Sequence, residues 1–590
     1  MKYSDIPLAQ TVVSLCKAKN IKHIVISPGS RNAPLTIGFT GDDYFKTYSV
    51  VDERSAAFIG VGLAQQLQEP VAVVCTSGSA LLNYYPAVSE AFYSDIPLVV
   101  ISADRPGYRI DIGDGQTIRQ DNVFDRHILY NANLKQDIRD NEIRILAEKN
   151  KAPLLQGADD QKLQQEIQAF NEAEMMKALT LAASQSGPVH INVPFEEPLY
   201  GNSTTPCIDV DIPESSSVPS QELEIDEYVS IWNGARRKMI LVGVLSPDAL
   251  ENEVLELLAA DPSVIVFSET TSNLHHEQYF PNIDKIIAPL EKLNDPDEMF
   301  QKLRPEILMT FGGMVISKKI KAFLRKYQPD HHWHIDSKKA YDTFFCLERH
   351  FKCEPNNFLK QFFGKTQAQE SEYQPYWLEI RKLRSACHRT YVDQIPFSDF
   401  KAYERILKNI PGVYNLHLSN SSTVRYAQLF FLTDNLRVYC NRGTSGIDGS
   451  TSTAVGAAIH SEYPTLLVTG DLSFFYDSNA LWNSYLRKDF RIIMLNNGGG
   501  GIFRILPGDK SDPNFETYFE TPHDLNAKGI CETYGLDYFS ATDELGLLEV
   551  LTNFYEDSER PRLLEIFTPR KINDQVLQGY FKYLADQQPK

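Results

Sequence analysis

The stretches Thr465-Leu-Leu-Val-Thr-Gly-Asp-Leu-Ser473 and Ile492-Ile-Met-Leu-Asn-Asn-Gly-Gly499 decide how this chain folds. Each begins with a short apolar run and ends in polar residues and glycine, a pattern typical of a buried strand followed by a loop. Strands this apolar belong to a parallel sheet that is covered on both faces. Because such sheets bind ligands at the carboxyl ends of their strands, Asp471 and Asn497 mark an expected ligand site.

The same alternation of apolar strands and amphipathic helices runs through most of the 590 residues. Two polar stretches interrupt it, residues 201–221 and residues 364–375, and their Ser, Thr, Gln and Pro content is typical of linkers. We therefore expect an α/β protein with three doubly wound parallel-sheet domains, at residues 1–200, 222–363 and 376–590.

Buried strands are expected where Val, Ile and other apolar residues concentrate. The expected strands are Ile21–Ser27, Thr47–Val51, Val71–Cys75, Leu98–Ser102, Val189–Val193, Met239–Val244, Val264–Phe267, Ile307–Phe311, His334–Ile335, Val413–Leu416, Val438–Cys440, Thr465–Val468, Ile492–Leu495 and Leu563–Ile566.

Composition and charge exclude several classes of protein. The net charge of -19 argues against a nucleic-acid partner, because a phosphate backbone would be repelled. There is no run of 18 apolar residues and no secretory signal at the amino terminus, so we expect no membrane insertion. The eight cysteines form no CxxC pair, which favours reduced thiols in a cytoplasmic protein.

Asp471 and Asn497 offer the ligands that a hard divalent cation prefers. Asp471 supplies an anionic oxygen, Asn497 an amide oxygen, and a glycine beyond Asn497 a backbone carbonyl. Neighbouring backbone N–H groups and a helix amino terminus can bind phosphates. This pattern predicts a diphosphate ligand held through Mg²⁺, or through Mn²⁺ in its place.

The pair resembles the diphosphate-binding motif of thiamine-diphosphate enzymes. By that resemblance Asp471, Asn497 and the carbonyl of Gly499 would be the protein ligands of the metal. One position departs from the usual Gly-Asp-Gly pattern, since Leu472 stands third. The resemblance also implies a pyrimidine-binding domain at 1–200, a central domain, and a diphosphate-binding domain at 376–590.

Glu53 ends an expected strand and precedes an apolar helix. Thiamine enzymes need a carboxylate against N1′ of the aminopyrimidine, and by resemblance Glu53 is that catalytic, cofactor-contacting residue. Read alone, Glu53 would be a helix-start charge favoured by the helix dipole.

Cationic side chains cluster in the expected ligand-facing loops. Because a guanidinium matches two carboxylate oxygens at once, they suit a substrate that bears several carboxylates. These residues are Arg31, Arg105, Arg425 and Arg442, with Lys318 and Lys319 after the strand Ile307–Phe311.

Several loops together resemble one family, the 2-succinyl-5-enolpyruvyl-6-hydroxy-3-cyclohexene-1-carboxylate synthases of menaquinone biosynthesis. The match spans the first and last thirds of the chain, and Gly470-Asp-Leu-Ser473 fits it because this family has Leu after the aspartate. The matching stretches are Ser27-Pro-Gly-Ser-Arg-Asn-Ala-Pro-Leu35, Asp52-Glu-Arg54, Thr76-Ser-Gly-Ser79, Ala103-Asp-Arg-Pro106, Gln116-Thr-Ile-Arg-Gln120, Asn441-Arg-Gly-Thr-Ser-Gly-Ile-Asp-Gly449 and Ile502-Phe503.

The resemblance implies decarboxylation of 2-oxoglutarate and conjugate addition of the succinyl carbanion to isochorismate. It implies substrate contacts at Ser30, Arg31, Arg105, Gln116, Lys318, Lys319, Arg425, Arg442 and Phe503, and cofactor contacts at Ser421 and Ile447. Gly115 stands where many relatives have Asn, so the effect of this loop position is left open.

The resemblance further implies a homodimer or homotetramer in which Glu53 of one copy serves the cofactor held by Asp471 of another.

Three other hypotheses fit the sequence less well. Another thiamine enzyme, such as an acetolactate synthase or a 2-oxoacid decarboxylase, would not explain the Arg31 and Arg442 loops. A non-catalytic paralogue would have lost Glu53, Asp471 or Asn497. An NAD-dependent oxidoreductase lacks its Gly-x-Gly-x-x-Gly turn here.

Overall fold

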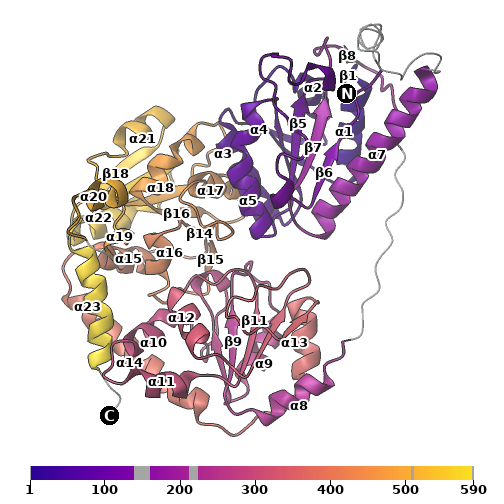
Figure 1. The fold of residues 1–590 in the computed structure, drawn as a ribbon. Helices are drawn as coiled ribbons and strands as arrows, with labels where there is room; N and C mark the ends of the chain where they lie inside the picture. The colour runs from indigo at the N-terminus through magenta and orange to yellow at the C-terminus, as the bar shows by residue number, and fades with distance from the viewer. Residues whose placement is uncertain (1, 139–159, 211–222, 506–509, 588–590) are drawn as a thin grey trace. The chain divides into compact units, whose positions relative to one another are not determined.

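A computed structural model describes residues 2–138, 160–210, 223–505 and 510–587. The described chain forms three parallel sheets flanked by helices, as expected (Figure 1). It divides into two compact units. The first comprises Met1–Ser217, Gly443–Glu462 and Asp477–Arg487, and the second comprises the remainder.

The sheet of the first unit has the order β3-β2-β4-β5-β7-β6, with every pair parallel. Apolar residues of its inner strands and of helices α1 and α7 form one core. In Figure 1, β5 and β7 lie between α1 and α7 on one side and α3 and α5 on the other. The elements are β1 (Tyr3–Ser4), α1 (Pro7–Ala18), β2 (His23–Ile26), α2 (Ala33–Thr40), β3 (Lys46–Ser49), α3 (Glu53–Leu67), β4 (Val71–Cys75), α4 (Ser79–Asn83), α5 (Tyr85–Tyr93), β5 (Leu98–Asp104), β6 (Tyr130–Asn133), α7 (Asp160–Ser184), β7 (Val189–Pro194) and β8 (Asn202–Ser203).

Helix α17 (Ser450–Ile459) belongs to the first unit and packs against α3 at glycine contacts. A Cβ on Gly62 would lie 2.0 Å from the carbonyl oxygen of Thr453, and a Cβ on Gly456 would lie 2.1 Å from that of Ile59. Only glycine permits the two backbones to come this close. The helix that begins at Glu53 is therefore fixed by a segment nearly 400 residues later in the chain.

The first sheet of the second unit shows why the middle of the chain is doubly wound. Its order is β10-β9-β11-β12-β13, all parallel. Met239 and Leu241 of β9 face one core, whereas Ile240 and Val242 face another on the opposite side. The elements are α8 (Asp226–Gly234), β9 (Lys238–Val242), α9 (Asn252–Ala259), β10 (Val264–Phe267), α10 (Ile283–Leu290), α11 (Pro296–Leu303), β11 (Ile307–Phe311), α12 (Lys318–Lys326), β12 (His331–Ile335), β13 (Arg349–Phe351) and α13 (Pro355–Phe363).

The second sheet of this unit has the order β15-β14-β16-β17-β19-β18, again all parallel. Its inner strands are almost wholly buried. The elements are α14 (Tyr373–Gln394), α15 (Asp399–Lys408), β14 (Tyr414–Leu418), α16 (Ser422–Ala427), β15 (Leu436–Tyr439), β16 (Thr465–Gly470), α18 (Asp471–Tyr476), β17 (Arg491–Asn496), α19 (Ile502–Ile505), α20 (Pro513–Phe515), α21 (Lys528–Tyr534), β18 (Asp537–Ala541), α22 (Glu544–Phe554), β19 (Arg562–Phe567) and α23 (Asn573–Asp586).

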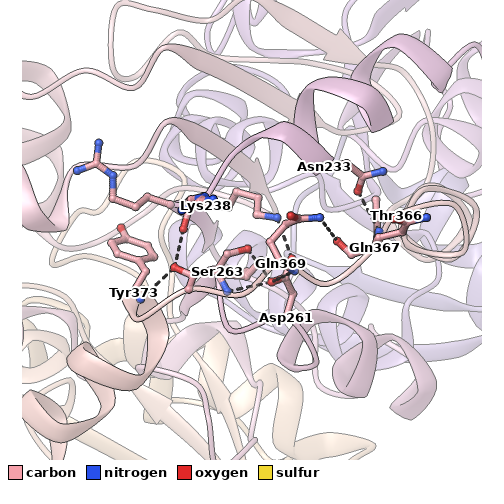
Figure 2. A network of polar contacts seen from close by, with 12 residues as sticks. Asn233, Lys238, Asp261, Ser263, Thr366, Gln367, Gln369 and Tyr373 are labelled. Atoms are coloured by element: carbon pink, nitrogen blue, oxygen red, sulfur yellow. Dashed lines mark hydrogen bonds and ion pairs between the residues drawn. The ribbon is translucent and has the colours of Figure 1, made fainter.

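The stretch 364–375, expected to be a linker, is tied to the middle sheet by polar contacts (Figure 2). The backbone N–H of Gln367 donates to Asn233 Oδ1 (2.9 Å), and that of Gln369 donates to Asp261 Oδ1 (3.1 Å). The buried Nζ of Lys238 donates to the other oxygen of Asp261 (2.8 Å). The expected linker 201–221 is described only to residue 210, and the rest lies outside the described residues.

Five strands were not predicted from the sequence: β1 and β8, which pair with each other in a separate two-stranded sheet, and β6, β13 and β18, each at the edge of a parallel sheet. An edge strand is covered less than an inner one, so its sequence needs no apolar run. Tyr-Asn-Ala-Asn in β6 and Arg-His-Phe in β13 illustrate this. The expected inner strands were found, within a few residues at each end.

None of the described helices is long and apolar enough to cross a bilayer. All eight cysteines are free thiols, and five of them are buried.

The contact between α3 and α17 gives a stability prediction. Gly456→Ala should lower the free energy of unfolding by about 1–3 kcal/mol, because the new methyl group meets backbone rather than a movable side chain. Gly529→Ala in α21 is the matched control: nothing lies within 4 Å of its added Cβ, so stability should hold or rise by up to about 1 kcal/mol. Urea unfolding followed by circular dichroism measures both, and equal effects would contradict the close contact.

Candidate functional site

Parallel pairing of β16 with β17 brings Asp471 and the glycine run after Asn497 together. Asp471 is the first residue of α18 and its side chain is buried. Its Oδ1 accepts from the backbone N–H of Leu472 (2.7 Å), and its Oδ2 accepts from that of Gly499 (3.0 Å). The carboxylate is therefore held at the carboxyl edge of the sheet, against the loop that follows the neighbouring strand.

The amide of Asn497 has a defined orientation. Its Nδ2 donates to Asp399 Oδ2 (2.9 Å), and its Oδ1 is buried with no hydrogen-bond partner among the described residues. A buried amide oxygen without a partner is costly unless something absent from the protein chain binds it. The orphaned oxygen therefore points to a ligand.

The residues present fit a hard divalent cation. They are the carboxylate of Asp471, the free amide oxygen of Asn497 and the carbonyl of Gly499, which accepts from Gly501 N–H (2.9 Å) and keeps a second lone pair. Across the described part of the chain, no group of three or more His, Cys, Asp or Glu residues could hold a metal ion. The three groups named above instead all offer oxygen, the donor atom that a hard divalent cation prefers.

His523 is a neighbour of the Asp471 carboxylate that sequence reasoning missed. Its Nε2 lies 3.3 Å from Asp471 Oδ2, and its backbone N–H donates to the carbonyl of Gly498 (3.2 Å). The interaction with the Asp471 carboxylate raises the pKa of His523 above its ordinary value, against the lowering effect of burial. No local motif around His523 signals this position, because the contact joins residues 52 positions apart.

A cationic group lies at the carboxyl ends of β14 and β15, in the same unit. Ser421 has φ of +69°, a strained conformation for a residue other than glycine, and its carbonyl accepts from Arg425 Nη1 (2.6 Å). Asn420 Oδ1 accepts from Arg442 Nη1 (2.6 Å), and Asn420 Nδ2 donates to the carbonyl of Asn441 (2.7 Å). Burial lowers the pKa of Arg425, and the nearby positive charge of Arg442 lowers it further.

The lysines at the start of α12 differ in their surroundings. Lys319 forms an ion pair with Glu291. Lys318 is exposed. The half-buried Lys321 has a lowered pKa, chiefly because of burial, and the positive charges of Arg442 and Lys318 lower it further. Lys321, which was not predicted, therefore shares the electrostatic surroundings of Lys318 and Arg442.

Glu269 fixes the turn that starts α12. Its carboxylate is buried, and it accepts from the backbone N–H groups of Ile316 (2.6 Å) and Ser317 (2.7 Å). Burial raises the pKa of Glu269 to about 7, although the two N–H donors and the charge of Arg442 oppose the rise. Both oxygens are engaged, so Glu269 sets the position of the helix that carries Lys318.

In the first unit, Glu53 is the first residue of α3, whose N-cap Asp52 accepts from the backbone N–H of Ser55 (3.1 Å). The Glu53 side chain is half-buried. The pKa values of Cys75 and Tyr84 are raised chiefly by burial, and the Glu53 carboxylate contributes to both rises. Glu53 thus lies near the carboxyl end of β4, at the ligand-binding edge of its own sheet.

Arg31 and Arg105 also lie in the first unit and are near enough for their charges to interact. Arg31 is buried, donates to the carbonyl of Phe195 (2.9 Å) and forms an ion pair with Glu197. Arg105 donates to Ser77 and to the carbonyl of Gln116 (3.0 Å). Burial lowers the pKa of Arg105, and the charge of Arg31 lowers it further.

The remaining predicted residues lie in loops or short helices. Ser30 and Gln116 are exposed, and Gln116 has φ of +56°, beside the exposed Gly115. Ile447 is an exposed apolar residue of the loop that precedes α17. Phe503 in α19 packs against Phe519, with ring centroids 6.0 Å apart.

Family models match residues in each of the three parallel sheets. Residues 6–127 match the thiamine pyrophosphate enzyme, N-terminal TPP binding domain; residues 214–416 match the middle domain of thiamine pyrophosphate enzymes; and residues 421–566 match the C-terminal TPP binding domain. The matched C-terminal domain contains Asp471, Asn497 and Ser421.

Several curated relatives carry the name 2-succinyl-5-enolpyruvyl-6-hydroxy-3-cyclohexene-1-carboxylate synthase. The protein of that name from Christiangramia forsetii is 58% identical over 99% of this chain and 100% of its own length. That from Flavobacterium psychrophilum is 52% identical over 99% and 100%. That from Porphyromonas gingivalis is 38% identical over 99% and 98%.

The role of Glu269 gives a prediction. Glu269→Gln places an amide N–H₂ against one of two backbone N–H donors, so the free energy of unfolding should fall by about 1–3 kcal/mol. Glu291→Gln, which removes the partly exposed partner of Lys319, should change it by less than about 1 kcal/mol. Chemical denaturation compares the two, and equal losses would show that the buried carboxylate does not hold the turn.

Proposed function

This chain belongs to the family of thiamine-diphosphate-dependent 2-succinyl-5-enolpyruvyl-6-hydroxy-3-cyclohexene-1-carboxylate synthases, and we propose that it joins 2-oxoglutarate to isochorismate with loss of CO₂. This would be a step of menaquinone biosynthesis. The observation that carries the proposal is the Asp471–Gly499 contact beside the orphaned Asn497 oxygen, in one unit with the cationic group of Arg425 and Arg442.

The metal and diphosphate would be held in the C-terminal domain, residues 376–590. Asp471, Asn497 and the Gly499 carbonyl would bind Mg²⁺ or Mn²⁺, and the strained Ser421 would contact the cofactor. When bound, thiamine diphosphate supplies the nucleophilic carbon that attacks a 2-oxo acid and stabilises the charge left by decarboxylation. Residues 1–200 would bind the aminopyrimidine, where the Glu53 carboxyl would hold a proton at N1′, and the exposed Ile447 would support the cofactor.

The reaction and the charges of its two substrates explain why the proposed site has several cationic side chains. One carbon–carbon bond of 2-oxoglutarate breaks to release CO₂, and its former keto carbon forms a new bond to the isochorismate ring. Both substrates are dianions, so guanidinium and ammonium groups orient them and reduce their repulsion. Arg425, Arg442 and Lys318 would do so from the second unit; the further substrate contacts would be Ser30, Arg31, Arg105, Gln116, Lys319 and Phe503.

We further propose a homodimer or homotetramer, located in the cytoplasm. The free state of all eight cysteines supports a reducing compartment. A shared site, with Glu53 from one copy and Asp471 from another, would make two-fold assembly a requirement for activity.

Donor choice tests the reaction. With isochorismate as acceptor, 2-oxoglutarate should exceed pyruvate in kcat/KM by about 100-fold or more, because pyruvate leaves the cationic groups without a second carboxylate. Arg442→Ala should reduce that preference. Arg437→Ala is the matched control and should leave the preference intact, because Arg437 lies on β15, before the loop that carries Arg442, and is paired with Asp248. Preference for pyruvate would instead identify an acetolactate-synthase-like enzyme.

Mixing two inactive variants tests the shared site. Glu53→Gln and Asp471→Ala should each abolish most turnover alone, the first while still binding cofactor and metal. Co-expressed, they should recover about a quarter of wild-type activity, because half of randomly assorted dimers are mixed and one of their two sites is intact. No recovery in a verified mixed dimer would place Glu53 and Asp471 of the same copy in one site.

A further inference from the structure

Asp399 lies beside the candidate metal ligands although it is 98 residues from Asn497 in the sequence. It is the first residue of α15, after the N-cap Ser398, and its side chain is buried. Helix capping does not explain a buried carboxylate at this position, because the Ser398 side chain already caps α15.

Both oxygens of the Asp399 carboxylate are engaged. Oδ2 accepts from Asn497 Nδ2 (2.9 Å), and Oδ1 accepts from Thr568 Oγ1 (2.5 Å). The backbone N–H of Asp399 donates to Asn573 Oδ1 (2.9 Å). Residue 399 is thus fixed by two further contacts besides the one that its carboxylate makes with the Asn497 amide.

A carboxylate can only accept hydrogen bonds, whereas a side-chain amide donates at one end and accepts at the other. Facing Asp399, Asn497 must turn its N–H₂ toward the carboxylate and its Oδ1 away. That oxygen is the buried atom left without a partner. A hard divalent cation binds an amide oxygen and not an amide nitrogen, so the flipped amide could not be a ligand.

We propose that Asp399 is a positioning residue that selects the metal-binding orientation of Asn497, through the hydrogen bond between Asn497 Nδ2 and Asp399 Oδ2. The inference rests on the proposed metal role of Asp471 and Asn497. Partners of this kind behind a metal ligand typically change metal affinity by about 10–100-fold when they are lost.

The first variant deletes the acceptor. Asp399→Leu cannot accept a hydrogen bond from Asn497, so the amide is free to turn. Mn²⁺ binding, followed by electron paramagnetic resonance without cofactor, should weaken about 10–100-fold. The Mg²⁺ concentration needed for thiamine diphosphate binding in calorimetry should rise by a similar factor.

The second variant exchanges donor and acceptor. When Asp399→Asn is combined with Asn497→Asp, the new amide at position 399 can donate to the new carboxylate at position 497 and still accept from Thr568. The second oxygen of the carboxylate at position 497 then faces the metal again. Metal affinity should return to within about tenfold of the wild type, which a merely structural role for Asp399 would not predict.

Thr568→Val is the matched control, since it removes the other hydrogen bond of the same carboxylate and leaves the Asn497 contact. Its metal affinity should stay within about threefold of the wild type, even if the melting temperature of the metal-free protein falls. If Thr568→Val lost as much metal affinity as Asp399→Leu, the proposal would be overturned. The loss would then follow from any disturbance around position 399 and not from the Asn497 contact.

Asp471→Ala separates this inference from the proposed function. If Asp471→Ala loses Mn²⁺ binding and Asp399→Leu does not, the positioning role is wrong and the metal site stands. If Asp471→Ala binds Mn²⁺ as well as the wild type, the metal site itself is wrong and the positioning role falls with it. Should Asp399→Leu fail to fold, the exchange variant decides, and loss of Mn²⁺ binding in that variant overturns the proposal.

Discussion

Parallel pairing of β16 with β17 is the interaction on which the candidate site depends. Asp471 and Asn497 lie 26 residues apart in sequence, and each follows its own strand. Because parallel strands end at the same edge, register alone places the Asp471 carboxylate against the Gly499 backbone. The neighbouring pairing of β14 with β16 and β15 adds Ser421 and Arg442 to the same edge.

Buried carboxylates recur in this protein as fixing points for loops. Glu90 accepts from the backbone N–H groups of Gly443 and Thr444, and Asp477 accepts from that of Ser452. Glu269 accepts from the backbone N–H of Ser317 at the start of α12, and Asp399 accepts from the side-chain amide of Asn497. Burial raises the pKa of Glu269 to about 7 and those of Asp399 and Asp477 to about 6, so keeping each group buried is costly. Hydrogen bonds from the segments that these carboxylates contact offset part of that cost, since they oppose the rise of each pKa.

The fold was largely predictable because inner strands of parallel sheets must be apolar on both faces. The inner strands β4 and β11 were predicted to the residue, as was the edge strand β10, whose four residues are also apolar and buried. The missed edge strands β6, β13 and β18 carry polar side chains, since one side of an edge strand pairs with no further strand. The contact of α3 with α17 was also unpredictable, because a glycine within a helix does not show which backbone it meets.

The sequence by itself determined the strand ends and the residue types that follow them, and these were sufficient to indicate a metal–diphosphate site and the family. Such features are local, because an apolar run and the polar residues after it fall within one strand and one loop. Only the tertiary structure decided which way the Asn497 amide faces, because that depends on its hydrogen bond to Asp399. It also decided that Lys321 shares the electrostatic surroundings of Arg442. The contacts of Asn420 with Arg442 and of Glu269 with the start of α12 were likewise visible only in the structure. Each of those contacts joins distant segments through hydrogen bonds whose direction depends on three-dimensional geometry, and no local pattern of residues specifies that geometry.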